Sequence, residues 1–367
     1  MRLKTLTLSF IFVTAAYASD QTELEKQLET LRDAYVIPGI SAAIYRDGQL
    51  VEHAVSGIRK VGSPELISRE DKFHLGSCTK SMTATVAATF VEEGKLSWDS
   101  KLSDLLPEIE IHSTLKDVSY EMLLAHGSGL AKDPDDETYI ELEKLETLEG
   151  REKLTTLFLG NAPTFKPGTF NYSNIGYIIA GHILEKISGK TWEMLLQERL
   201  FIPLQMQSCG FGPTSDPTET VPTQPWGHII REWTIKPVHD DNAAFYGPSA
   251  NVHCSTSDWV KYLYIHLRGF NGEAKLLSQE SFKQLHKIWP DNDSNQYTFG
   301  GWYRLNRPWA KGEVLTHTGT NTYNYASVWM DPKANVILVS NANRSKFSGG
   351  WASSDAISAM IRLFIKN

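Results

Sequence analysis

Apolar side chains recur at helical spacing in three stretches of the chain. Leu24, Leu28 and Leu31 follow this spacing and predict a helix over 21–35. Two longer stretches carry similar stripes, and each is closed by a glycine of the kind that favours the end of a helix. They are 77–93, closed by Gly94, and the segment after Asn174, closed by Gly189.

Short apolar runs bounded by turn residues predict strands near both ends of the chain. Asp47-Gly48 is a strong hairpin signal between two such runs. The predicted strands are 40–45, 50–55, 300–305, 325–330 and 336–340, and a closing helix is predicted at 356–365. Between them, residues 95–165 are mostly of helical pattern, and 205–250 is rich in Pro, Thr and Gly and predicts long loops.

Strands at both ends with helices between them predict an α+β fold. We expect one antiparallel sheet flanked by helices, with an inserted all-helical lobe. The sheet part is predicted at about 19–80 and 205–367, and the helical lobe at about 81–204. Together, 19–367 would form a single domain.

The first residues have the pattern of a targeting segment. Arg2 and Lys4 precede a short apolar run, and Ala16-Tyr17-Ala18 offers small residues at a cleavage site. We therefore expect a signal peptide at 1–18. A membrane anchor is the alternative, but the run is too short to span a bilayer, and no cysteine follows it that would carry a lipid. The expected location is periplasmic or secreted, with no stable membrane anchor.

Composition and charge limit the classes of molecule that the protein is expected to bind. The 367 residues are 41% hydrophobic and 22% charged, as in ordinary globular proteins. Removal of 1–18 would leave 34 basic residues against 43 acids, a formal charge of −9 without a basic stripe. This argues against nucleic acid and anionic membranes as partners. Residues 133–149 carry eight acids and one lysine, either as a solvated helix face or as a rim that repels anionic substrates.

Three cysteines leave at least one thiol free. Cys78 lies inside the motif described next, and we interpret it as buried packing and not as a nucleophile. Whether Cys209 and Cys254 form a disulfide is left open by the sequence.

Common catalytic motifs are absent from the sequence, which has no His-Glu-x-x-His, no Gly-x-Gly-x-x-Gly, no phosphate loop and no Gly-x-Ser-x-Gly. What remains is Ser77-Cys78-Thr79-Lys80 at the start of a predicted helix. Residues at i and i+3 project from one helix face, and a buried lysine has a lowered pKa that suits a base. The same spacing at Ser113 and Lys116 has no apolar-periodic helix behind it, so Ser77 is favoured.

Two further motifs follow in order, Tyr172-Ser173-Asn174 and His317-Thr318-Gly319. With Ser-x-x-Lys, this series resembles the serine penicillin-recognising enzymes, which include class C β-lactamases, DD-peptidases and related serine esterases. The resemblance covers nearly the whole mature chain. Supporting stretches are 73–76, 123–130, 202–206 and 337–341.

The resemblance implies a role for each motif residue. Ser77 would attack a carbonyl, Lys80 and Tyr172 would share the transfer of its proton, and Asn174 would orient Lys80 and the substrate amide. The oxyanion would lie between the backbone N–H groups of Ser77 and Thr320. No metal or organic cofactor is implied. The simpler alternatives are a helix cap for Ser77, a core aromatic for Tyr172, a turn or cap residue for Asn174 and a strand-end histidine for His317.

The third motif bears on the substrate. Class C β-lactamases usually have lysine where this chain has His317, and histidine is largely neutral near pH 7. The site would then lack a fixed cation for a β-lactam carboxylate, unless Arg304 supplies one; the alternative for Arg304 is a solvated strand residue. Residues 321–324 read Asn-Thr-Tyr-Asn where many relatives have glycines, so the pocket wall there is expected to be bulkier.

The sequence thus predicts an exported serine hydrolase that acts through an acyl-enzyme on D-amino-acid peptides or small esters. A class C-like β-lactamase is the first alternative. The second is a non-catalytic penicillin- or peptidoglycan-binding module. The expected partner is a small-molecule or peptide substrate, and the oligomeric state is left open.

Overall fold

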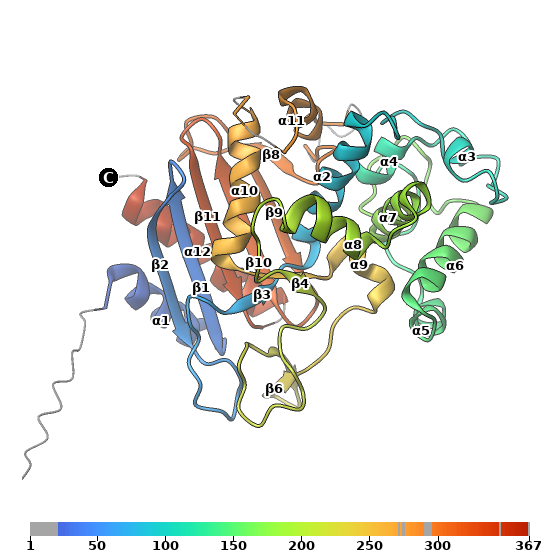
Figure 1. Cartoon of the computed structure of the whole chain (residues 1–367). Helices are drawn as coiled ribbons and strands as arrows, with labels where there is room; N and C mark the ends of the chain where they lie inside the picture. Colours follow the sequence, from blue (N-terminus) through green and yellow to red (C-terminus); the bar gives the residue numbers. More distant parts are fainter. Residues whose placement is uncertain (1–20, 271, 274–275, 290–295, 345, 366–367) are drawn as a thin grey trace, which may run out of the picture.

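A six-stranded antiparallel sheet joins the two ends of the chain, as the computed structural model shows (Figure 1). Its strands lie in the order β2-β1-β11-β10-β9-β8. Their bounds are β1 Gly39–Arg46, β2 Gln49–Gly57, β8 Tyr303–Asn306, β9 Glu313–Thr320, β10 Tyr325–Asp331 and β11 Val336–Ala342. Strand β1 pairs antiparallel with β11, with Ala42 opposite Ser340. The predicted antiparallel sheet and the hairpin at Asp47-Gly48 are confirmed.

The structure describes residues 21–270, 272–273, 276–289, 296–344 and 346–365. The predicted signal peptide at 1–18 lies outside these residues. Within them, no helix combines the length and the apolar character needed to cross a membrane.

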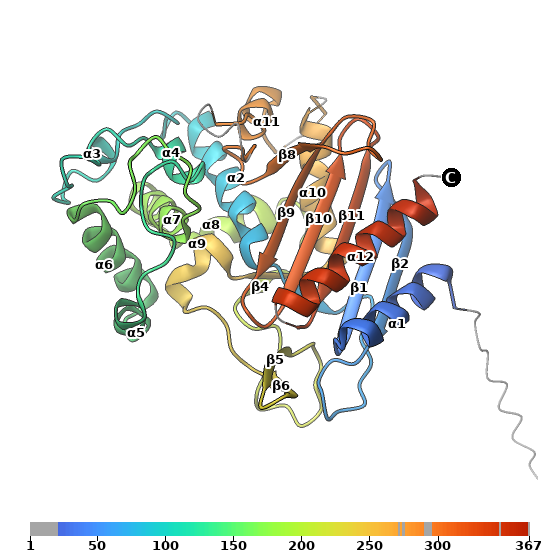
Figure 2. The same ribbon diagram turned by 180° about the vertical axis from the view of Figure 1, so that it is seen from behind.

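Helices cover both faces of the sheet. Helices α1 (Glu23–Tyr35) and α12 (Lys346–Phe364) lie on one face (Figure 2), and α10 (Thr256–Phe270) lies across the other (Figure 1). Helix α11 (Gln279–Leu285) packs against α10. Successive residues of a strand point to opposite faces of the sheet. Ala42 thus packs in the hydrophobic cluster beneath α1 and α12, and Ala43 packs in the larger cluster on the other face. Burial on both faces explains why β1 and β11 are apolar almost throughout.

The helical lobe lies beside the sheet and is inserted after β3 (Lys72–His74) (Figures 1 and 2). It begins with a 3-10 turn, η1 Gly76–Cys78, that leads into α2. The helices of this lobe are α2 Thr79–Glu92, α3 Leu102–Leu105, α4 Tyr120–Leu124, α5 Asp136–Glu143, α6 Thr147–Gly160, α7 Asn174–Ser188, α8 Trp192–Leu196 and the π-helical turn η2 Gln197–Phe201. The domain boundaries near 80 and 204 stay a prediction.

The stretch 205–250, predicted as loops, contains short ordered elements. They are β4 Gly210–Phe211, β5 Gly227–Arg231, β6 Thr234–Val238, η3 Ala244–Tyr246 and α9 Gly247–Ala250, followed by β7 Val252–Ser255. Strands β3, β7 and β4 form a small sheet of their own. The prediction failed here because strands of two to five residues are too short to show a period.

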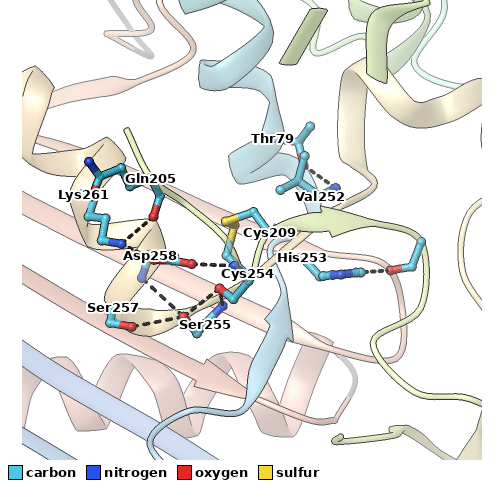
Figure 3. Close-up of a disulfide and its surroundings, with 12 residues drawn as sticks. Thr79, Gln205, Cys209, Val252, His253, Cys254, Ser255, Ser257, Asp258 and Lys261 are labelled. Carbon is cyan, nitrogen blue, oxygen red and sulfur yellow. Dashed lines mark hydrogen bonds and ion pairs between the residues drawn. A yellow bond between two sulfur atoms is a disulfide. The ribbon is translucent and has the colours of Figure 1, made fainter. Parts of the chain in front are cut away.

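A disulfide joins Cys209 to Cys254 on β7 (Figure 3). Strand β7 pairs with β3, the strand that leads into Ser77, so the disulfide fastens the chain beyond the helical lobe close to the nucleophile turn. Cys78 is free and buried, as expected.

Two errors of the sequence prediction lie toward the C-terminal end, a wrong helix start and a missed strand. Helix α12 begins at Lys346, well before the predicted start at 356. Its first turns contain Gly349 and Gly350, which are poor helix formers, but a Cβ on either would lie 3.2 Å from the Tyr325 side chain. Strand β9, which contains the His-Thr-Gly motif, was not predicted.

Candidate active site

A tight turn presents Ser77 to the end of strand β9. Gly76 has a positive φ of 50°, which favours glycine, and a Cβ there would lie 2.2 Å from the Thr320 nitrogen. A Cβ on Gly319 would lie 1.9 Å from the Leu75 oxygen and 2.7 Å from the Ser77 nitrogen. The two backbones therefore touch, and both glycines are needed for the backbone amides of Ser77 and Thr320 to come close together.

Lys80 is fully buried at the first turn of α2, directly behind Ser77. Its Nζ lies 3.1 Å from Ser77 Oγ, 2.6 Å from Asn174 Oδ1 and 3.0 Å from the backbone oxygen of Ser249. Burial lowers the pKa of Lys80 to about 7, against an opposing effect of Asp133. Near neutral pH much of Lys80 is therefore neutral, and its lone pair can accept the Ser77 proton.

Tyr172 lies against the same pair. Lys80 Nζ is 4.9 Å from its ring centroid. Burial raises the pKa of Tyr172, and a hydrogen bond with Ser77 offsets part of that rise. The phenol therefore stays protonated near neutral pH, so it can donate a proton, while the neutral amine of Lys80 can accept one.

Asn174 is the first residue of α7, which Ser173 caps through a 3.0 Å bond from the Gly176 N–H to its Oγ. The Asn174 Nδ2 donates to Asp133 Oδ1 at 2.6 Å, so its Oδ1 is left to face Lys80. Tyr246 donates to the same Asp133 oxygen at 3.0 Å.

Asp133 is a site residue that the sequence did not single out. The acidic stretch 133–149 was noted only as a whole, and its first member alone reaches this network through Asn174 and Tyr246. Its place three residues after the end of the supporting stretch 123–130 is the one signal that pointed toward the site.

His317 is buried inside β9, beneath the cleft surface. Its Nδ1 donates to the Thr318 carbonyl at 2.6 Å. Burial, and then the charge of Lys80, lower the pKa of His317 to about 3. The imidazole is therefore neutral, and His317 contributes no cation.

Arg304 is not part of this site, and its predicted role as a substitute cation was wrong. It lies on β8 and pairs with Glu313 on β9, with Nε 2.9 Å from Oε2. It lines a different cavity together with Phe270 and Lys333. The neighbouring carboxylate, which the sequence pattern did not reveal, holds the guanidinium there.

The second Ser-x-x-Lys copy differs sharply from the first. Ser113 and Lys116 are exposed and lie in a turn. The absence of a buried helix behind them agrees with the preference for Ser77.

A cleft of about 570 Å³ opens over Ser77. The aromatic rings of Tyr139, Tyr172, Tyr246 and Tyr325 contribute to its walls; the other lining residues are Ser77, Lys132, Asp133, Asn174, Asn242, Thr318, Gly319, Thr320 and Thr322. Its two charged side chains, Lys132 and Asp133, face each other at 3.6 Å. The described residues hold no group of three or more histidines, cysteines or acids that would bind a metal ion.

The fold and the order of the three motifs define a serine penicillin-recognising protein. The Beta-lactamase family model matches residues 24–355, and the chain belongs to this family.

Two relatives in sequence are longer than this chain. Penicillin-binding protein 4 of Amycolatopsis lactamdurans is 28% identical over 254 residues, which are 68% of this chain and 64% of that protein. Protein flp of Staphylococcus aureus strain MW2 is 24% identical over 312 residues, 84% of this chain and 60% of that protein. The chain thus spans less than two thirds of these relatives.

Solved structures show the same fold. The octameric penicillin-binding protein homologue from Pyrococcus abyssi has a TM-score of 0.76 at 22% identity, covering 92% of this chain and 77% of that one. D-amino acid amidase from Ochrobactrum anthropi SV3, complexed with L-phenylalanine amide, has a TM-score of 0.72 at 20% identity, covering 93% of this chain and 99% of that one. A class C β-lactamase from Rhodobacter sphaeroides has a TM-score of 0.72 at 19% identity, covering 92% of this chain and 99% of that one.

Proposed function

We propose that this protein is an exported serine hydrolase that forms an acyl-enzyme on Ser77, with D-amino-acid peptides or small esters as substrates. The observation that carries this proposal is the buried Lys80 with its Nζ 3.1 Å from Ser77 Oγ. A serine so placed next to a neutral amine has the base that an activated nucleophile needs.

The reaction follows from these contacts. Ser77 Oγ attacks the substrate carbonyl while its proton passes to Lys80. The resulting oxyanion accepts hydrogen bonds from the backbone N–H groups of Ser77 and Thr320. Lys80, through Tyr172, returns the proton to the leaving group, and the acyl-enzyme forms. Water then attacks the acyl carbon and gives a proton to Lys80. Lys80 returns this proton to Ser77 Oγ as the acyl–oxygen bond breaks, and the carboxylic acid product leaves. Loss of one oxyanion donor typically costs roughly 3 kcal/mol of transition-state stabilisation.

The charges of the cleft favour esters and peptide amides without a free carboxylate over β-lactams, which carry one. His317 is neutral, and Arg304 lies in another cavity. Among the described lining residues, Lys132 is the one cation, and Asp133 faces it at 3.6 Å. A carboxylate ligand would compete with Asp133 for that lysine. The D-amino acid amidase and D-stereospecific amidohydrolase among the similar structures support a D-amino-acid substrate.

Acyl-enzyme trapping tests the proposal. The wild type, treated with a fluorophosphonate or a reactive penicillin, should gain the mass of one adduct, and Ser77→Ala should gain none. An unmodified wild type, or an equal adduct on Ser77→Ala, would overturn the assignment.

Turnover then separates the alternatives. A persistent penicillin adduct agrees with a peptidase-like site, whereas rapid turnover of a chromogenic cephalosporin would establish a β-lactamase. Ligand binding without any adduct, unaffected by Lys80→Ala and Tyr172→Phe, would establish the non-catalytic module.

Export is supported by the Cys209–Cys254 disulfide, since such bonds persist mainly in oxidising compartments. Expression of the full chain in a bacterium should yield a periplasmic or secreted product whose N-terminal sequence begins at Ser19. A product that keeps residues 1–18 would contradict cleavage there.

A further inference from the structure

A buried carboxylate, Asp241, lies between the two segments that meet at Ser77. Its side chain is 4% exposed, and the His74 ring beside it is 1% exposed. Asp241 is not among the residues that line the cleft. The Asp241 carboxylate accepts the backbone N–H of Asn242 at 2.8 Å, and its two other bonds lead to His74 and Asn321, on either side of Ser77.

The first connection runs through His74 to the nucleophile turn. The Gly76 N–H donates to His74 Nδ1 at 3.1 Å. Because Nδ1 accepts this bond, the ring proton lies on Nε2, which donates to Asp241 Oδ2 at 2.8 Å. Both ring nitrogens are thus occupied, and His74 cannot serve as a base for Ser77.

The second connection runs through Asn321 to the end of β9. Asn321 Nδ2 donates to Asp241 Oδ1 at 2.9 Å. The amide oxygen of Asn321 accepts the backbone N–H groups of Tyr323 at 3.2 Å and Asn324 at 2.9 Å, which closes the turn after β9. Asn321 directly follows Thr320.

The two connections end next to the two amides that the proposed mechanism uses. Gly76 precedes Ser77, Asn321 follows Thr320, and the backbones of Gly76 and Thr320 are in contact. We propose that Asp241 is a positioning residue that fixes the spacing of the Ser77 and Thr320 N–H groups by holding His74 on one side and Asn321 on the other.

This role is distinct from activation of the nucleophile. Lys80 is held by Ser77, Asn174 and Ser249, and neither His74 nor Asp241 bonds to it. The inference rests on the proposed acyl-enzyme chemistry and adds a residue to it. An isosteric Asp241→Asn change would weaken one of the two connections. The carboxylate of Asp241 offers one oxygen to His74 Nε2 and the other to Asn321 Nδ2, whereas the amide of asparagine has a single oxygen.

The test compares an ester with the matching thionoester, in which sulfur replaces the carbonyl oxygen. Sulfur is a weak hydrogen-bond acceptor on a longer bond, so the thionoester gains less from correctly spaced donors. Asp241→Asn should lose about 10- to 100-fold in kcat/KM on the ester and clearly less on the thionoester. The ratio of the two rates should therefore fall, which a general loss of folded enzyme would not produce.

Asp240→Asn is the matched control. Asp240 is the preceding acid and accepts the Tyr323 hydroxyl at 2.7 Å, but it bonds to neither His74 nor Asn321. Its ester-to-thionoester ratio should remain that of the wild type.

Asn321→Ala provides a second variant, which removes one connection and leaves the Asp241–His74 pair intact. It should also lower the ratio, and it decides the question if Asp241→Asn does not fold. A folded variant of either kind with an unchanged ratio would overturn this inference alone. A wild type that turns over neither substrate would overturn the proposed function, and this inference with it.

Discussion

The charge of Asp133 should raise the pKa of Lys80 and so set the acid side of the pH profile. Two hydrogen bonds of 2.6 Å, one on each side of the Asn174 amide, connect the carboxylate to Nζ. The charges therefore lie within about 8 Å, where an effective dielectric of ~20 to 40 gives about 1–2 kcal/mol. Since Asp133 is 38% exposed, solvent screening favours the lower end, about 0.7 of a pKa unit.

Asp133→Asn keeps an oxygen for Asn174 and removes the charge. Lys80 must be neutral to act as a base, and the loss of a nearby anion disfavours its protonated form. The apparent pKa on the acid side of kcat/KM should therefore fall by about 0.7, and activity should persist to lower pH. The assay is hydrolysis of a neutral chromogenic ester from about pH 5 to about pH 9.

Asp135→Asn provides the control. Asp135 is exposed and caps α5 through Thr138, a role that asparagine fills equally well. An acid limb that stays in place or moves upward in Asp133→Asn would refute the reasoning. An equal shift in both variants would mean that surface charge in general, and not the Asn174 connection, controls Lys80.

Three further predictions concern stability. Reduction of Cys209–Cys254, which closes a separation of 45 residues, should cost about 3–4 kcal/mol of unfolding free energy, measured with and without reductant in urea; an unchanged midpoint would contradict this. Arg151→Met should cost about 3–5 kcal/mol in the same assay, because the fully buried guanidinium pairs with two glutamates; a neutral result would show that solvent or another cation reaches them. Burial lowers the pKa of His286 and His317 to about 3. The unfolded chain thus binds more protons than the folded one between about pH 3 and 6.5, so at pH 5 each histidine should cost about 2 kcal/mol relative to pH 7. A melting temperature constant over that range would be inconsistent with neutral buried rings.

The parts of the fold with a clear period were predictable from sequence. The N-terminal hairpin carries Asp47-Gly48 at its turn, and α7 is bounded by Ser173 and Gly189. Helix α12 was predicted too short because its first turns contain Gly349 and Gly350. A Cβ on Gly350 would meet the Tyr325 ring on β10, a contact between distant segments that no local pattern expresses, and a Cβ on Gly349 would lie 2.4 Å from the Arg344 oxygen.

The candidate site residues likewise divide into those that a local motif predicts and those whose position depends on a distant partner. Ser77, Lys80, Tyr172 and Asn174 were found because each lies at a fixed place in a short motif, and the structure brings them together. Arg304 failed because its position depended on Glu313, a partner on the neighbouring strand.

The motifs do not describe the buried environment that lowers the pKa of Lys80. A lysine at the start of a helix is ordinarily charged, and the Ser113–Lys116 copy shows that the spacing alone creates no such site. Lys80 is different because α7 and α9 bury it and supply the acceptors on Asn174 and Ser249. Those acceptors lie far along the chain from Lys80, in segments with little common pattern. The proposed base can therefore be found in the sequence, but its pKa is a property of the assembled fold.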